Sequence, residues 1–205
     1  ALADALAPGE PIDLGGHSLG GNIVMHYAGV RPSRVRRVVS LDGFGIPHEE
    51  PAEAPRKFAA WLDALREPPT FAAYRDLDAV ADRLQKNNPR LARDRALHIA
   101  RHWADVATDG KARLNSDPRH KLPFPTVYRV EEVYAVWRAI EAPVLWVAAA
   151  ESYIPNWLGD HPEGEGAVDT LAGVRRRLAH IRGGRLVVID DAGHMLHHDQ
   201  PAAVA

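Results

Sequence analysis

The segment GGHSLGGN, residues 15–22, holds one serine among four glycines and follows a short apolar stretch. Within it, Gly16 to Gly20 fit the pattern G-x-S-x-G, in which a tight turn between a strand and a helix presents a serine hydroxyl. Such a hydroxyl can attack a carbonyl carbon once a base removes its proton. We therefore predict that Ser18 is a nucleophile. The backbone N–H of Leu19, at the start of the helix, is the predicted oxyanion donor.

A serine nucleophile needs a histidine base, and the histidine needs a carboxylate to orient it. Among eleven histidines, His194 in DDAGHML follows the last predicted strand, in a loop that can reach over the sheet. The expected chain order of serine, acid and histidine leaves two acids at strand ends. We predict that Glu151, after the third strand, lies within hydrogen-bonding reach of His194. Asp42, after the second strand, is the alternative acid.

Other chemistries would use parts of the same pattern. A glycine-rich turn before a helix can bind phosphate, but neither G-x-x-x-x-G-K-[ST] nor G-x-G-x-x-G occurs in the chain. His197 and His198 follow His194 at a spacing that could suggest a metal site. Catalysis already accounts for His194, and the other two open a helix, so we predict neither a metal nor a cofactor. The chain contains no cysteine, which excludes thiol nucleophiles and disulfides.

Four apolar segments are predicted to be the strands that position these residues. They are 11–14, 35–43, 142–152 and 185–194, and the last of these runs from a strand into a loop. Helix-like segments alternate with them, which predicts an α/β fold with a parallel sheet and flanking helices. We expect the strands to pair in chain order, with the strand around Ile12 at one edge.

Residues 46–140 differ in character from the segments on either side. Four helix-like stretches separated by proline-rich loops make this region too long for a connecting loop. We predict a core in two parts, residues 1–45 and 141–205, interrupted by a helical insertion at 46–140. Five aromatic residues of the insertion would either line a substrate pocket or simply pack its helices; they are Trp61, Trp103, Tyr128, Tyr134 and Trp137.

Composition narrows the range of partners. The chain has 205 residues, 46% of them apolar, and a net charge of −2, which favours neither nucleic acid nor an anionic membrane. The longest uncharged apolar run, Ala142 to Ala150, is too short to cross a bilayer, and the opening ALADALAPGE is not a signal peptide. The clusters Arg34/Arg36/Arg37 and Arg175/Arg176/Arg177 are expected to be solvated. These features predict a cytoplasmic protein; the oligomeric state stays open.

In motif order and spacing the chain resembles the α/β-hydrolase superfamily. The resemblance rests on GHSLGG, AAAES and DAGHMLHHDQP, and the insertion would correspond to the cap. Its QKNNPRL and DPRHKLPFPTVYR are similar to a capped bacterial group of serine hydrolase-like proteins. The resemblance implies hydrolysis of an ester or related acyl bond in a small or medium apolar acyl substrate. It also implies the residue roles: Ser18 attacks, His194 relays the proton, and Glu151 orients His194.

Alternatives within this resemblance are a non-catalytic binding protein of the same fold, and acyl transfer or C–C hydrolysis at the same residues. Haloalkane dehalogenases are disfavoured because they place Asp where this chain has Ser18. Family members usually have Asp where this chain has Glu151.

The superfamily takes its second oxyanion donor from a loop with a His-Gly pair before the serine, and no such pair occurs here. We therefore expect a fragment of a longer hydrolase that lacks the N-terminal strands. Its second oxyanion donor would lie outside this chain. The isolated 205 residues would be marginally stable and close to inactive.

Overall fold

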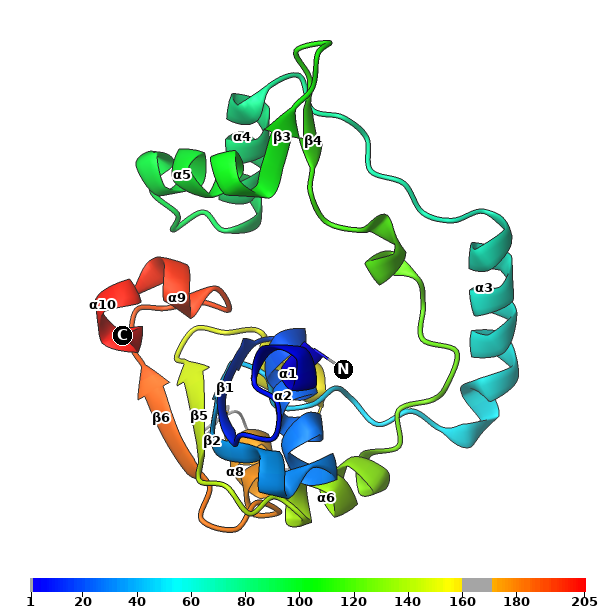
Figure 1. Cartoon of the computed structure of the whole chain (residues 1–205), viewed down its shortest axis with the longest axis vertical. Coiled ribbons are helices and arrows are strands. Elements are labelled where there is room, and N and C mark those ends of the chain that lie inside the picture. Colours follow the sequence, from blue (N-terminus) through cyan, green and yellow to red (C-terminus); the bar gives the residue numbers. More distant parts are fainter. Residues whose placement is uncertain (1, 160–170) are drawn as a thin grey trace. The chain divides into compact units, whose positions relative to one another are not determined.

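A computed structural model describes residues 2–159 and 171–205, whose contacts divide the chain into two compact units. The first unit comprises residues 1–49 and 128–205, and the second comprises residues 50–127 (Figure 1). The boundary differs from the predicted insertion at 46–140. Residues 128–140 belong to the first unit because the apolar side chains of their helix pack in its core.

The first unit is built on a four-stranded parallel sheet in the order β1-β2-β5-β6. Its strands are β1 (Ile12–His17), β2 (Val35–Leu41), β5 (Val144–Ala149) and β6 (Arg185–Ile189). This order is the chain order that the sequence predicts. Among the described residues no strand pairs with the outer edge of β1.

One face of this sheet packs against α2 (Leu19–Val30), α6 (Val130–Arg138) and α8 (Ala172–Leu178), and the short helix α7 (Ile154–Leu158) contributes to the same core. The amphipathic segment AVDTLAGVRRRLAHI, residues 167–181, predicts a helix that includes α8, and its first four residues lie outside the described part of the chain. At the centre of this face, the rings of Trp137 and Trp146 meet edge to face with centroids 5.3 Å apart. Trp137 is therefore a core residue of the sheet unit and does not line a pocket.

The other face of the sheet carries a smaller buried cluster near the carboxyl ends of the strands. Val147 and Ala149 of β5 pack there against Ala192 and Leu196. Two short helices, α9 (Leu196–Asp199) and α10 (Pro201–Val204), follow β6. In the described part of this unit, α1 (Leu2–Leu6) and η1 (Pro32–Arg34) are the other helices.

The second unit has its own core, formed where α4 (Leu77–Asn87) packs against α5 (Arg93–Trp103). The stretch ARDRALHIARHWADVA, residues 92–107, predicts one helix, but the prediction is wrong at its end: Ala104–Val106 forms strand β3, which pairs with β4 (Ala112–Leu114). Gly110, with φ of 77°, allows the tight turn between these strands.

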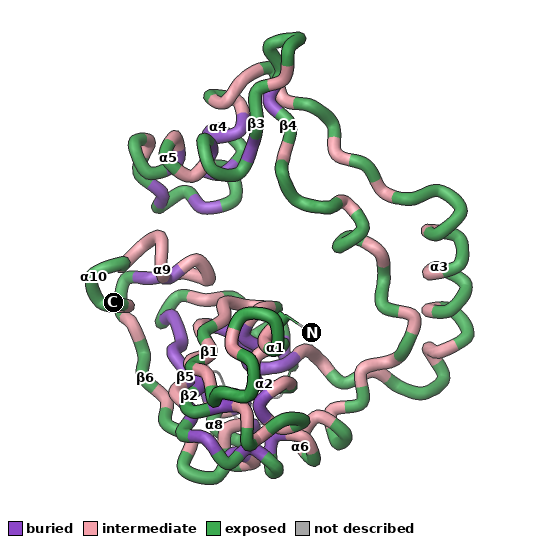
Figure 2. Tube along the Cα trace, viewed as in Figure 1, coloured by how far each residue is buried: buried purple, intermediate pink, exposed green. Residues whose placement is uncertain are grey.

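In the same unit, α3 (Ala54–Arg66) buries none of its residues (Figure 2). Two single-turn helices, η2 (Pro51–Glu53) and η3 (Pro118–Lys121), complete the unit. Within the described ranges of the whole chain, no helix has the length and apolar character that crossing a bilayer requires.

Candidate active site

Ser18 occupies the turn that joins β1 to α2. Its backbone has φ of 54° and ψ of −120°, a conformation that costs a non-glycine residue about 1–3 kcal/mol. Its N–H donates to the carbonyl of Leu41 at 2.8 Å, which ties the turn to the end of β2. Glycine is required on both sides, because a Cβ at Gly16 would overlap the backbone of Gly20, and one at Gly21 would overlap the Ser40 hydroxyl.

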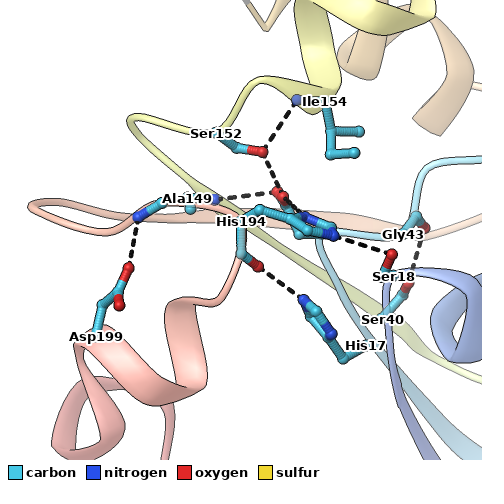
Figure 3. A network of polar contacts seen from close by, with 11 residues as sticks. His17, Ser18, Ser40, Gly43, Ala149, Ser152, Ile154, His194 and Asp199 are labelled. Atoms are coloured by element: carbon cyan, nitrogen blue, oxygen red, sulfur yellow. Dashed lines mark hydrogen bonds and ion pairs between the residues drawn. The ribbon is translucent and has the colours of Figure 1, made fainter. Parts of the chain in front are cut away.

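His194 connects this serine to a carboxylate (Figure 3). Its Nε2 lies 3.0 Å from Ser18 Oγ, and its Nδ1 lies 2.7 Å from Asp42 Oδ2. With Nδ1–H donated to the carboxylate, Nε2 is left to accept the proton of the serine hydroxyl. The imidazole is 15% exposed and the Asp42 side chain 0% exposed, so the acid end of the relay is shielded from solvent.

The predicted acid, Glu151, is wrong. Asp42, the alternative acid, holds the imidazole in its place. The reason lies in the sheet order: β2 is the direct neighbour of β1, and Asp42 is the first residue after β2. Glu151 is exposed, and its backbone N–H donates to the carbonyl of Ala192 at 3.0 Å. The serine, the acid and the histidine still follow one another in the expected chain order, and the acid is an aspartate and not a glutamate.

The end of β5 and the loop after it supply hydrogen-bond donors to this acid. Ser152 Oγ donates to Asp42 Oδ2 at 2.5 Å, and the N–H of Ala149 donates to Oδ1 at 3.3 Å. Ser152 Oγ in turn accepts from the N–H of Ile154 at 3.1 Å. These two donors satisfy the buried carboxylate oxygens and fix their orientation.

A group of histidines packs behind His194. His17 Nε2–H donates to the backbone carbonyl of His194 at 2.7 Å, and the His17 ring centroid lies 4.5 Å from that of His197. Burial lowers the pKa of His17. Burial, with smaller contributions from neighbouring histidines, lowers the pKa of His197 to about 4. The sequence gives no sign of this contact of His17, which joins residues 177 positions apart in the chain.

Arg177 fixes the loop that follows Asp42. The predicted solvation of the arginine cluster is wrong for this residue, which is 0% exposed. One of its guanidinium nitrogens, Nη1, donates to the carbonyls of Phe44 and Ile46, each at 3.0 Å. On the opposite side, Asn22 Oδ1 accepts from the N–H of Gly45 at 2.8 Å. The acid therefore stands on a loop held from two helices.

Two apolar side chains lie beside the reacting groups and are exposed. Leu19 is 50% exposed and is the first residue of α2, so its N–H has no partner within the helix. Tyr153 is 60% exposed, and its ring meets that of His194 edge-on with centroids 5.2 Å apart. The placement of Leu19 matches an oxyanion donor directed at the serine.

His197 and His198 do not join a metal site in this structure. The described ranges contain no group of three or more His, Cys, Asp or Glu residues arranged to hold a metal ion.

A serine on a strand-to-helix turn, faced by a histidine and an acid from later strand ends, is the arrangement of α/β-hydrolase enzymes. The family model described as "Alpha/beta hydrolase family" matches residues 1–205, and the chain belongs to this family. No curated protein matches the sequence significantly.

Several solved structures share the fold. A hypothetical protein from Pseudomonas aeruginosa PAO1 is 24% identical with a TM-score of 0.77, the match covering 98% of this chain and 66% of that one. The thioesterase domain from the curacin biosynthetic pathway is 21% identical with a TM-score of 0.75, covering 98% and 65%. An esterase from Mycobacterium tuberculosis is 21% identical with a TM-score of 0.62, covering 99% and 60%. The chain thus spans less than two thirds of the length of these proteins.

Proposed function

We propose that this chain provides the active site of a serine hydrolase that cleaves an ester, thioester or related acyl bond through Ser18, His194 and Asp42. The observation that carries the proposal is the continuous line of contacts from Ser18 Oγ to His194 Nε2 at 3.0 Å and from His194 Nδ1 to Asp42 Oδ2 at 2.7 Å. Esterases and a thioesterase among the proteins of like fold support the same class of reaction.

The first half of the reaction forms an acyl-enzyme. Ser18 Oγ attacks the carbonyl carbon of the substrate while His194 Nε2 takes the hydroxyl proton. Asp42 stabilises the imidazolium through Nδ1–H, and the N–H of Leu19 donates to the oxyanion. When the tetrahedral intermediate collapses, the bond to the leaving alcohol or thiol breaks and His194 returns its proton to that group.

In the second half, His194 removes a proton from a water molecule that attacks the acyl carbon. The bond to Ser18 Oγ then breaks, the serine regains its proton from Nε2, and the free acid leaves. Leu19 and Tyr153 expose apolar surface beside the reacting atoms, which supports an acyl group that is itself apolar.

A fluorophosphonate probe tests the proposal directly, because it reacts with serine only where a base activates the hydroxyl. In the full-length protein we expect one label per chain, located by mass spectrometry in the peptide that contains Ser18. Ser18→Ala should abolish labelling, whereas Ser33→Ala, which changes an exposed serine on η1, should leave it unchanged. Equal labelling of the two variants would overturn the assignment.

A panel of p-nitrophenyl esters and thioesters of increasing acyl length would then define the substrate class. We expect turnover of apolar acyl groups and its loss in Ser18→Ala. Labelling of Ser18 without turnover of any ester or thioester would point to a different acyl bond.

A further inference from the structure

The second unit contains a cavity of about 640 Å³. Its walls come from α4, the end of α5, β4 and the segments that precede α4 and follow β4, so all of its lining residues lie between Phe71 and Lys121. A volume of this size falls in the range of about 300–1,000 Å³ that is usual for small-molecule sites. The cavity is thus separate in sequence from Ser18, Asp42 and His194.

The side chains on its walls that can carry a charge near neutral pH are all basic. They are Arg83, His102, His120 and Lys121, and no Asp or Glu lines the cavity. The nearby acids of α4, Asp78 and Asp82, are both bound by Arg93, at 2.6 Å and 2.7 Å. Within residues 2–159 and 171–205, neither Arg83 nor Lys121 forms an ion pair with a carboxylate. An anion entering the cavity would meet uncompensated positive charge.

Aromatic rings make up much of the remaining wall. Phe71, Tyr74 and Trp103 line the cavity, and Trp103 is 49% exposed. Lys121 Nζ lies over the Phe71 ring, 4.4 Å from its centroid. This cation is held against a ring and not against an acid, which leaves its charge available to a ligand. A flat or alkyl group placed against these rings would cover apolar surface that the chain leaves open.

We propose that this cavity binds a small amphipathic anion: a molecule with an aromatic or alkyl body and one carboxylate, sulfonate or phosphate group. The body packs against Trp103, Phe71 and Tyr74. The anionic group is received by the basic residues, and Asn87 and Asn115 of the lining offer amide hydrogen bonds to it. The proposal concerns the second unit only and does not depend on the chemistry of Ser18.

Two related fluorescent probes separate the charge from the apolar surface. The probe 8-anilinonaphthalene-1-sulfonate is an aromatic body with one anionic group, and N-phenyl-1-naphthylamine is the same body without it. Titrated into the full-length protein, the sulfonate should bind saturably at one site per chain and more tightly than the neutral probe. Its affinity should fall as salt is added, because the attraction is screened.

Charge-removing variants locate the site. Arg83→Gln combined with Lys121→Gln should weaken binding of the sulfonate about tenfold. This is the combined effect of losing two charge contacts that are partly exposed to solvent. The neutral probe should change by less than about twofold under the same substitutions. Lys86→Gln is the matched control, because Lys86 is exposed on α4 and does not line the cavity. Trp103→Ala should weaken both probes.

The melting temperature of each variant is compared with that of the native chain to exclude a folding defect. If the double variant is unstable, the single substitutions at Arg83 and Lys121 replace it. Absence of saturable binding would overturn the proposal. The proposal would also be overturned if Lys86→Gln weakened binding of the sulfonate as much as Arg83→Gln and Lys121→Gln do. The attraction would then be a property of the whole surface and not of the cavity. Binding only of an acidic peptide, with no response to the sulfonate, would also contradict a small-molecule site.

Discussion

The Ser18 site and the cavity of the second unit both collect histidines and polar groups, but they differ in how these groups are partnered. At the Ser18 site each reacting group faces another group of the chain: serine to imidazole, imidazole to Asp42, and Asp42 to two further donors. In the cavity, Arg83 and Lys121 meet no carboxylate within the described ranges. The groups of the first site are therefore arranged for a reaction before any ligand binds. In the cavity the basic side chains have no negative partner among the described residues, and an anionic ligand would supply one.

Burial follows the same division. Asp42 is 0% exposed and is held on a loop fixed by Arg177, while Trp103 of the cavity is 49% exposed. A buried and fully bonded network loses much when one member is removed, because its partners are left unsatisfied. An open binding surface loses only the contact that is removed. Substitutions should therefore have larger effects at the first site than at the second.

The largest effects are expected at the two residues that exchange the proton. Ser18→Ala and His194→Ala should each lower kcat/KM for an ester substrate by about 10⁴-fold or more, because these residues act as one unit. Thermal unfolding should change little in Ser18→Ala, whereas His194→Ala also removes a hydrogen-bond donor to the buried Asp42 carboxylate and should lower the melting temperature. A variant that keeps near-normal turnover would remove its residue from the mechanism and weaken the contrast with the cavity.

His17 should act as a positioning residue through the carbonyl of His194. We expect His17→Ala to lower kcat by about tenfold to a hundredfold with KM unchanged, since a shift of the His194 loop by a fraction of an ångström misaligns the base. His17→Gln, whose side-chain amide can still donate, should restore part of kcat. His26→Ala, at an exposed residue of α2, is the control. Loss of stability without a change in kcat would show a purely structural role.

Ser152 should matter less for turnover than for stability. Ser152→Ala removes one donor to the buried Asp42 carboxylate, so the free energy of unfolding should fall by about 1–3 kcal/mol, measured by urea denaturation. Turnover should fall by less than about tenfold, because Ala149 still donates to Asp42. Ser152→Thr keeps the hydroxyl and should lose less stability than Ser152→Ala. Equal losses in the two variants would mean that the hydroxyl is not the important group.

The smallest effect concerns pH. The pKa of His197 is lowered from 6.5 to about 4 in the folded chain, so protons bind more tightly to the unfolded state. Its contribution to stability should therefore be present above pH 6.5 and be lost as the pH falls toward 4. The melting temperature of His197→Gln should depend less on pH over this window than that of the native chain. His26→Gln should follow the native curve; a His197→Gln curve parallel to the native one would contradict the prediction.

Much of the first unit could be predicted because its signals are local. Short apolar segments separated by helix patterns predict the four strands and their order, and the glycines around Ser18 reflect close backbone contacts at Gly16 and Gly21. The strand β3 could not be predicted in this way, since the apolar spacing of α5 continues into Ala104. Tertiary pairing with β4 decides its structure.

The choice between the two acids depends on geometry that spacing does not contain. Both Asp42 and Glu151 follow strand ends, and both come between serine and histidine in the chain. What separates them is that β2 lies next to β1, and that Asp42 is the residue immediately after its strand. Ser152, one position beyond Glu151, then serves as a donor to Asp42. The sequence therefore identifies the edge of the sheet and the kind of residue, and the pairing of strands identifies which carboxylate is used.

The most direct test of this account is a comparison of kcat/KM for Asp42→Asn and Glu151→Gln on one ester substrate in the full-length protein. Both substitutions replace a carboxylate with an amide of nearly the same shape. We predict that Asp42→Asn lowers kcat/KM by about 10⁴-fold, because the imidazole loses its orienting acid, and that Glu151→Gln stays within about twofold of the native value. A large loss in Glu151→Gln with turnover retained in Asp42→Asn would contradict the assignment of Asp42 as the acid.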